Sequence, residues 1–113
     1  MLDFQKTIPI SNALKVVFDP VQNANLGLFS AGDGCYVELI EPVGQSALTW
    51  NYLKKNGDGL HHICYEGLSL LEVDNLIREK RMLKIRGPIP AILFERDVVF
   101  AITRTKTIVE FLL

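Results

Sequence analysis

Short apolar runs separated by turn signals fill the first third of the chain. Residues 13–18 are apolar and β-branched, and they end at Asp19 and Pro20, which stop strand pairing. A second run at 25–30 is closed by residues 31–34, whose glycines supply the positive φ of a hairpin turn, and a third run follows at 35–40. This pattern predicts three β-strands.

The middle of the chain changes to helical spacing. Ser46 is a candidate N-cap for a short helix that ends at Asn56 and Gly57. A fourth strand is expected at 61–66, where period-two alternation places His62, Cys64 and Glu66 on one face and Ile63 and Tyr65 on the other.

The clearest helix begins at Ser69, because Ser69 and Glu72 form the pattern of a capping box. Its buried stripe is Leu70, Val73 and Ile77, and it is expected to end near Met82. Two prolines between 87 and 90 lack the N–H donor of a central strand. The C-terminal half is predicted to follow a β, α, β, β, β order. After the helix come a strand segment at 83–86, an apolar run that resumes at 91–94 beyond the prolines, a hairpin tip at 95–97, and strands at 98–103 and 107–113.

Composition fits one globular domain spanning residues 1–113. The chain is 49% hydrophobic and 22% charged, and its net charge of -1 gives no positive field for nucleic acid or an anionic membrane surface. The sequence shows neither an export signal nor a membrane-spanning run, so we expect a cytoplasmic protein. Cys35 and Cys64 lack metal or redox spacing and are expected to be buried thiols.

Three ionisable side chains interrupt the apolar strands. Glu38, His62 and Glu110 each lie among Val, Ile, Leu or Phe residues, where a charged group is costly to bury unless it is paired. Carboxylate and imidazole ligands suit an octahedral divalent metal. The alternative is a sheet with one wet face, on which Glu and His alternate with core residues at no cost.

The segments around these residues resemble a known superfamily. The run VELIEP at 37–42, the run GLHHICYE at 59–66, and the closing segments GPIPAILF at 87–94 and IVEFL at 108–112 are similar to the vicinal oxygen chelate (glyoxalase, bleomycin resistance, dioxygenase) superfamily, in the branch of methylmalonyl-CoA epimerase-like proteins. The resemblance implies an α+β fold of paired βαβββ modules that form a curved mixed sheet around a concave cavity. It implies that 13–42 is the remnant of a first module truncated at its N-terminus, 46–57 a connecting helix, and 60–113 a complete second module.

The same resemblance implies a set of site residues. Glu38, His62 and Glu110 match the second, third and fourth ligand positions for a divalent ion such as Co, Mn, Ni, Zn or Mg. The first ligand of the family is a His on the opening strand, and no His precedes His61 in this sequence. Glu110 is the implied catalytic base.

Three further residues are assigned to ligand binding, namely Gln22, Tyr36 and Cys64. The resemblance implies a second proton-transfer Glu at a position that Gln22 occupies here, and an amide cannot accept a substrate proton at neutral pH. His61 is expected to face the helix side together with Ile63.

Two functions remain open from the sequence. One is a small-molecule-binding protein, a degenerate relative of the epimerases; the other is an active metal-dependent isomerase or lyase that abstracts a proton next to a carbonyl or thioester. An acyl-CoA is the implied ligand class, and the cations near the two helices either meet its phosphates or form a solvated helix face. An uncovered sheet edge predicts a homodimer, in which residues 4–10 could pair with either chain.

Overall fold

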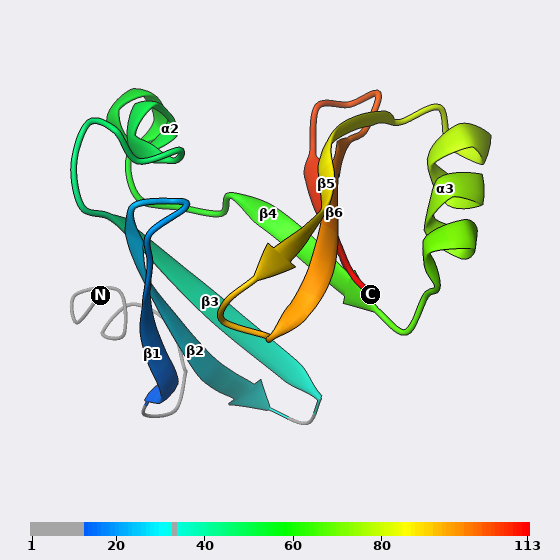
Figure 1. Ribbon diagram of the computed structural model, residues 1–113. Helices are drawn as coiled ribbons and strands as arrows, with labels where there is room; N and C mark the ends of the chain where they lie inside the picture. Colours follow the sequence, from blue (N-terminus) through cyan, green and yellow to red (C-terminus); the bar gives the residue numbers. More distant parts are fainter. Residues whose placement is uncertain (1–12, 33) are drawn as a thin grey trace. The chain divides into compact units, whose positions relative to one another are not determined.

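The computed structural model describes residues 13–32 and 34–113, which fall into two compact units (Figure 1). The first unit ends at Asp58 and the second is Gly59–Leu113. Residues 4–10, considered above for strand pairing, lie outside the described residues. That the whole chain folds as one domain stays a prediction.

The first unit contains a three-stranded antiparallel sheet in the order β1-β2-β3. The register places Val17 opposite Leu26 and Leu28 opposite Glu38. All three strands predicted from the apolar runs are confirmed, each slightly longer than the run itself, with bounds Ala13–Asp19, Ala24–Gly32 and Cys35–Pro42.

Helix α2 (Trp50–Asn56) is shorter than the sequence predicts, and Ser46 is not its N-cap. The Ser46 hydroxyl instead accepts a hydrogen bond of 2.8 Å from the side-chain amide of Asn23. Residues 44–49 form turns, so the helix begins after Thr49, whose side chain makes no capping bond. The predicted C-terminal stop is confirmed, because Gly57 has φ 72° and its N–H reaches the Leu53 carbonyl at 2.8 Å.

The second unit is a complete βαβββ module. Its sheet has the order β4-β7-β6-β5, in which β4 pairs parallel to β7 and the other neighbours pair antiparallel. A parallel pair needs a long crossover, and here α3 lies in that connection and covers one face of the sheet (Figure 1). The bounds are His62–Glu66 for β4, Leu70–Glu79 for α3, Leu83–Ala91 for β5, Arg96–Ile102 for β6 and Ile108–Leu112 for β7.

Strand β5 corrects two predictions from the C-terminal third. It runs unbroken through the prolines because it is an edge strand, where a missing N–H donor is tolerated, and its register shifts there. The segment 91–94 is not a strand; residues 92–95 form the turn into β6, closed by a 2.9 Å bond from the Glu95 N–H to the Ala91 carbonyl. Gly87 lies so close to β6 that a Cβ there would collide with the Val98 carbonyl.

Helix α3 begins with the predicted capping box. The Ser69 hydroxyl accepts from the Glu72 N–H at 3.2 Å, and the Glu72 carboxylate accepts from the Ser69 N–H at 3.1 Å. Val73 and Ile77 are buried, as predicted, but Leu70, the first residue of the helix, is 40% exposed. The helix ends at Glu79, earlier than the expected Met82.

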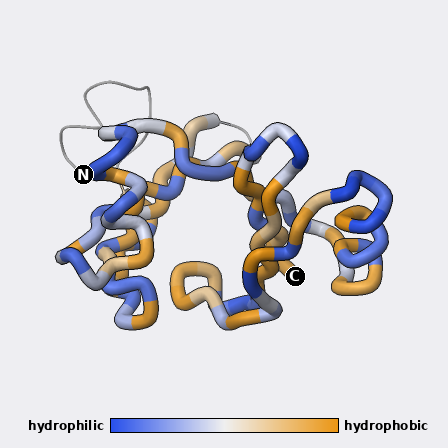
Figure 2. The backbone as a smooth tube through the Cα atoms, turned by 90° about the horizontal axis from the view of Figure 1, so that it is seen from above, coloured by the Kyte–Doolittle hydropathy of each residue, from blue (hydrophilic) through white to orange (hydrophobic). Residues whose placement is uncertain are grey.

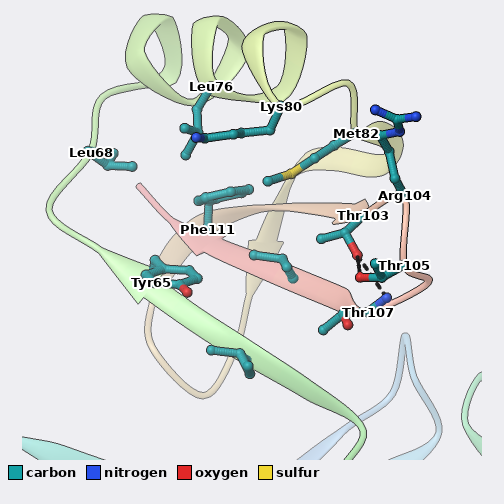
Figure 3. Close-up of a pocket in the computed structure, with 12 residues that line it drawn as sticks. Tyr65, Leu68, Leu76, Lys80, Met82, Thr103, Arg104, Thr105, Thr107 and Phe111 are labelled. Carbon is teal, nitrogen blue, oxygen red and sulfur yellow. Dashed lines mark hydrogen bonds between the residues drawn. The ribbon is translucent and has the colours of Figure 1, made fainter.

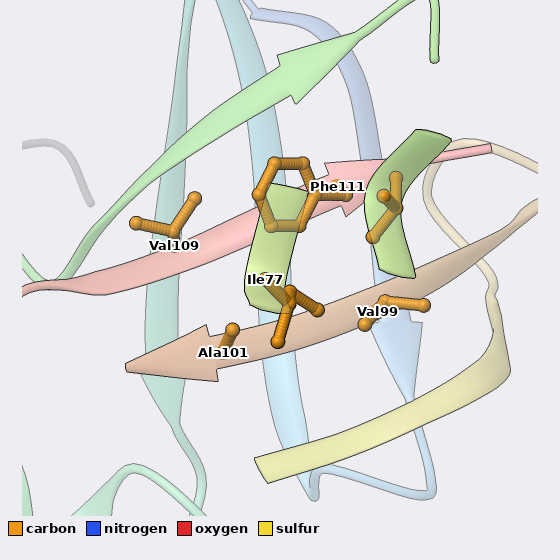
Figure 4. Close-up of a cluster of buried hydrophobic side chains, with 6 residues drawn as sticks. Ile77, Val99, Ala101, Val109 and Phe111 are labelled. Carbon is orange, nitrogen blue, oxygen red and sulfur yellow. The ribbon is translucent and has the colours of Figure 1, made fainter. Parts of the chain in front are cut away.

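The core of the second unit lies between α3 and the inner strands of its sheet (Figure 4). Burying side chains of this size contributes about 1.5–3 kcal/mol each. The cluster consists of Val73, Ile77, Val99, Ala101, Val109 and Phe111.

Neither Cys35 nor Cys64 forms a disulfide, and both are exposed, so the prediction of buried thiols is wrong. Cys35 is the first residue of β3, next to a hairpin, and Cys64 lies on the edge strand β4, where neighbours cover only one side. Figure 2 shows hydrophobic and hydrophilic positions alternating along the chain of each unit. In the part of the chain that the structure describes, no helix has the length and apolarity needed to span a membrane.

Candidate functional site

Two neighbouring strands of the second unit bring His62 and Glu110 together. His62 opens β4 and Glu110 lies in β7, and the parallel register puts His62 beside Ile108 and Cys64 beside Glu110. The two side chains therefore extend from the same face of the sheet, and His62 Nε2 lies 3.0 Å from Glu110 Oε1. The structure thus joins two of the three predicted metal ligands.

This pair is withdrawn from solvent. The side chain of His62 is 9% exposed and that of Glu110 is 4% exposed. The ring of Phe100, opposite Glu110 on β6, meets the His62 ring edge to face with centroids 5.8 Å apart. A buried carboxylate is costly without compensation, so the imidazole contact stabilises Glu110 in this position.

His61 is part of the same cluster, contrary to the prediction that it faces the helix side with Ile63. Its Nδ1 lies 2.9 Å from Nδ1 of His62, and the two rings meet edge to face. His61 precedes β4, so strand alternation does not fix its side chain. Burial lowers the pKa of His61 below its usual value, and the neighbouring His62 lowers the pKa further.

Glu38, the third predicted ligand, lies in the middle of β3 in the first unit. It is partly buried and pairs in register with Leu28 of β2. Tyr36, predicted to bind ligand, lies two residues earlier and shares its face, with 59% of its surface exposed. That Glu38 joins His62 and Glu110 stays a prediction.

The other two predicted ligand-binding residues have different surroundings. Gln22 follows β1, and its side-chain amide donates a 2.9 Å hydrogen bond to Asp19 Oδ2. Cys64 shares the face of His62 and is exposed, with its thiol 3.7 Å from the Tyr65 carbonyl oxygen. Cys64 is therefore placed beside the histidine and carboxylate pair, whereas Gln22 helps to hold a turn.

The opposite face of the same sheet carries a groove of about 590 Å³ that the sequence analysis missed (Figure 3). Tyr65 and Phe111 stack along it with centroids 6.1 Å apart, and the Thr103 and Thr105 hydroxyls are joined at 3.0 Å near one end. Alternation along β4 predicts that Ile63 and Tyr65 lie on this face, but not that the loop at 103–107 completes the groove. Its lining residues are Ile63, Tyr65, Leu68, Leu76, Lys80, Met82, Thr103, Arg104, Thr105, Thr107, Val109 and Phe111.

The fold has well-matched solved counterparts. A hypothetical protein from Bacillus halodurans superimposes with a TM-score of 0.81 at 21% identity, covering 96% of this chain and 79% of that one. Methylmalonyl-CoA epimerase from Mycobacterium tuberculosis gives a TM-score of 0.80 at 12% identity, covering 98% and 75%. A variant of the Streptomyces coelicolor epimerase in complex with 2-nitronate-propionyl-CoA gives 0.79 at 18% identity, covering 97% and 83%.

Identities this low establish a shared fold, and the α+β glyoxalase-like architecture is thereby confirmed. No curated protein matches the sequence. The family profile described as the glyoxalase/bleomycin resistance protein/dioxygenase superfamily matches residues 1–87, which is more than half of the chain. The chain therefore belongs to the glyoxalase/bleomycin resistance protein/dioxygenase superfamily.

Proposed function

We propose that this protein binds a small molecule through a divalent metal ion held by His62, Glu110 and Glu38. The observation that carries the proposal is the buried contact between His62 Nε2 and Glu110 Oε1 at 3.0 Å. The contact brings an imidazole nitrogen and a carboxylate oxygen together in a buried site. Co²⁺, Mn²⁺, Ni²⁺, Zn²⁺ and Mg²⁺ bind nitrogen and oxygen ligands of these kinds, with different preferences between the two.

The donors present fit such an ion. Glu110 is among the most buried ionisable groups of the described residues, and a cation would offset the cost of keeping its charge there. Glu38 would add a second carboxylate, which is supported by its mid-strand position in β3 and by the resemblance of the VEL run to the family. When bound, an ion of this kind would act as a Lewis acid on a substrate carbonyl oxygen.

An acyl-CoA is the ligand class that we propose. The supporting fact is that a solved structure of similar fold holds methylmalonyl-CoA and another holds 2-nitronate-propionyl-CoA. Tyr36 shares the face of Glu38, and Cys64 shares the face of His62, so both could contact such a ligand. We also propose that the protein acts in the cytoplasm.

Thermal unfolding with and without metal tests the metal site. At a hundredfold excess over Kd, a ligand of the folded state adds about 2.7 kcal/mol, which for a chain of this size raises Tm by roughly 10 °C. We expect this rise with Co²⁺ or Mn²⁺ in the wild type and its loss in Glu110→Gln. The matched control is Glu66→Gln, an exposed acid of the same sheet that pairs with Arg96 and should keep the full response. The absence of any rise with every divalent ion tested would refute the site.

The second candidate function is a working isomerase or lyase. It is favoured by the burial of Glu110, because a carboxylate of this kind can accept a proton from a carbon next to a thioester. The amide of Gln22 cannot supply a second base. Solvent deuterium exchange into methylmalonyl-CoA in the presence of cobalt decides between the two: incorporation above the buffer rate establishes proton abstraction, whereas none leaves a protein that binds without epimerising.

A further inference from the structure

Three side chains form a continuous chain of hydrogen bonds at the start of β4. His61 Nδ1 lies 2.9 Å from His62 Nδ1, and His62 Nε2 lies 3.0 Å from Glu110 Oε1. One nitrogen of the His62 ring, Nδ1, therefore contacts His61, and the other, Nε2, contacts Glu110. Phe100 adds an edge contact to the same ring, so its orientation is held from several directions.

Proton positions in this chain follow from donor and acceptor chemistry. An ionised carboxylate only accepts, so without metal the proton of a neutral His62 lies on Nε2 and points to Glu110. The Nδ1 of His62 is then a lone pair, and His61 must donate its own Nδ1 proton to it.

A metal ion held by His62 through Nε2 would reverse this order. Coordination needs the Nε2 lone pair, so the proton of His62 must lie on Nδ1, and His61 Nδ1 must accept it. His62 loses a proton at Nε2 and gains one at Nδ1, while His61 loses one at Nδ1 and gains one at Nε2. Both rings stay neutral, and this exchange within the pair releases no net proton.

We propose that His61 is a positioning residue of the metal site, which fixes the metal-binding tautomer and orientation of His62 by changing from hydrogen-bond donor to acceptor. The inference rests on the proposed metal site and adds a residue to it. Partners that orient a ligating histidine are worth about 10- to 100-fold in metal affinity. Sequence reasoning had given His61 no role at the site.

Nitrogen-15 NMR of the histidine rings tests the proposal without any activity measurement. In the metal-free wild type we expect protonated Nε2 in His62 and protonated Nδ1 in His61. With Zn²⁺, which is diamagnetic, both assignments should reverse. A His61 that keeps its Nδ1 proton in the zinc form overturns the inference.

Two variants give the affinity test. His61→Phe has no ring nitrogen and should weaken Zn²⁺ binding about 10- to 100-fold, while His61→Asn, whose amide oxygen can accept from His62, should recover part of that loss. Equal affinity in wild type and His61→Phe overturns the role of His61 while leaving the metal site intact. A wild type that binds no zinc overturns the proposed function itself, so the two failures are distinguishable, and the wild-type spectra need no variant to fold.

Discussion

Two carboxylates are buried among the described residues, and their partners differ. Asp19, which is 5% exposed, accepts a 2.9 Å bond from the Val21 N–H and a 2.9 Å bond from the Gln22 side chain, all within one turn. Glu110, which is 3% exposed, meets His62 across 48 positions of sequence. A carboxylate whose hydrogen-bond donors all come from the next few residues is typical of a structural turn. A buried acid that contacts a side chain from a distant strand is typical of a functional site.

The structural role of Asp19 leads to the first prediction. Asp19→Ala leaves a backbone N–H and the Gln22 amide without their acceptor, which should lower the free energy of unfolding by about 1–3 kcal/mol. Urea denaturation measures the loss. The exposed Asp58 is the matched control, since Asp58→Ala should stay within about 0.5 kcal/mol. Equal effects of the two substitutions would show that the turn does not depend on Asp19.

At the residue scale, sequence reasoning singled out His62 and Glu110 but did not predict what surrounds them. His62 and Glu110 were found because an ionisable group inside an apolar strand is conspicuous. His61 was misplaced because it lies just outside β4, where alternation no longer applies. The prediction that Cys64 is buried rests on the usual burial of thiols, and only the strand order shows that β4 is an edge strand.

At the element scale, helix α3 depends on its capping box. Ser69→Ala removes the acceptor of the Glu72 N–H and should cost about 1 kcal/mol of stability, measured by chemical denaturation. Ser46→Ala is the informative control, because Ser46 resembles a cap in sequence but contacts the Asn23 side chain on the surface. Its effect should stay within about 0.5 kcal/mol; a larger loss than that of Ser69→Ala would contradict the assignment.

Glu72 gives the same cap a pH dependence. Hydrogen bonds from the backbone and side chain of Ser69 lower the pKa of Glu72 below 4.5. A carboxyl group with a depressed pKa contributes stability that is present above its unfolded pKa and is lost as the pH falls through the folded value. Below pH 4.5 the Tm measured by thermal unfolding should therefore decrease less steeply with falling pH for Glu72→Gln than for the wild type. Identical slopes would contradict this contribution.

Local signals explain why some elements were predicted well and others were not. The α3 capping box and the glycine after α2 are read within a few residues, and both were confirmed. Strand β5 was divided because its prolines exclude a central strand, yet an edge position tolerates them. Whether a strand lies at an edge is decided by its partners, which a local pattern does not contain.

At the scale of the whole molecule, the βαβββ order of the second unit was predictable and its strand pairing was not. The order follows from successive apolar periods, whereas the parallel pairing of β4 with β7 joins residues about half the chain apart. The family resemblance supplied the glyoxalase-like α+β fold, which the solved counterparts confirm. No local pattern could have supplied it.

The edge position of β4 supports the expectation of a homodimer. Ile63 and Tyr65 on this strand are 43% and 53% exposed, and an apolar edge is a site of association. Light scattering at high protein concentration should give about twice the mass of the chain, which is 12.7 kDa. Ile63→Lys should shift the mass toward that of one chain. A strictly monomeric wild type would contradict the expectation.

We propose that one divalent ion is shared by His62, Glu110 and Glu38. Anomalous diffraction from crystals grown with Zn²⁺ tests it most directly. The claim predicts a single peak about 2.0–2.2 Å from His62 Nε2 and from an oxygen of each carboxylate. A peak on other residues, or none at a saturating zinc concentration, would contradict it.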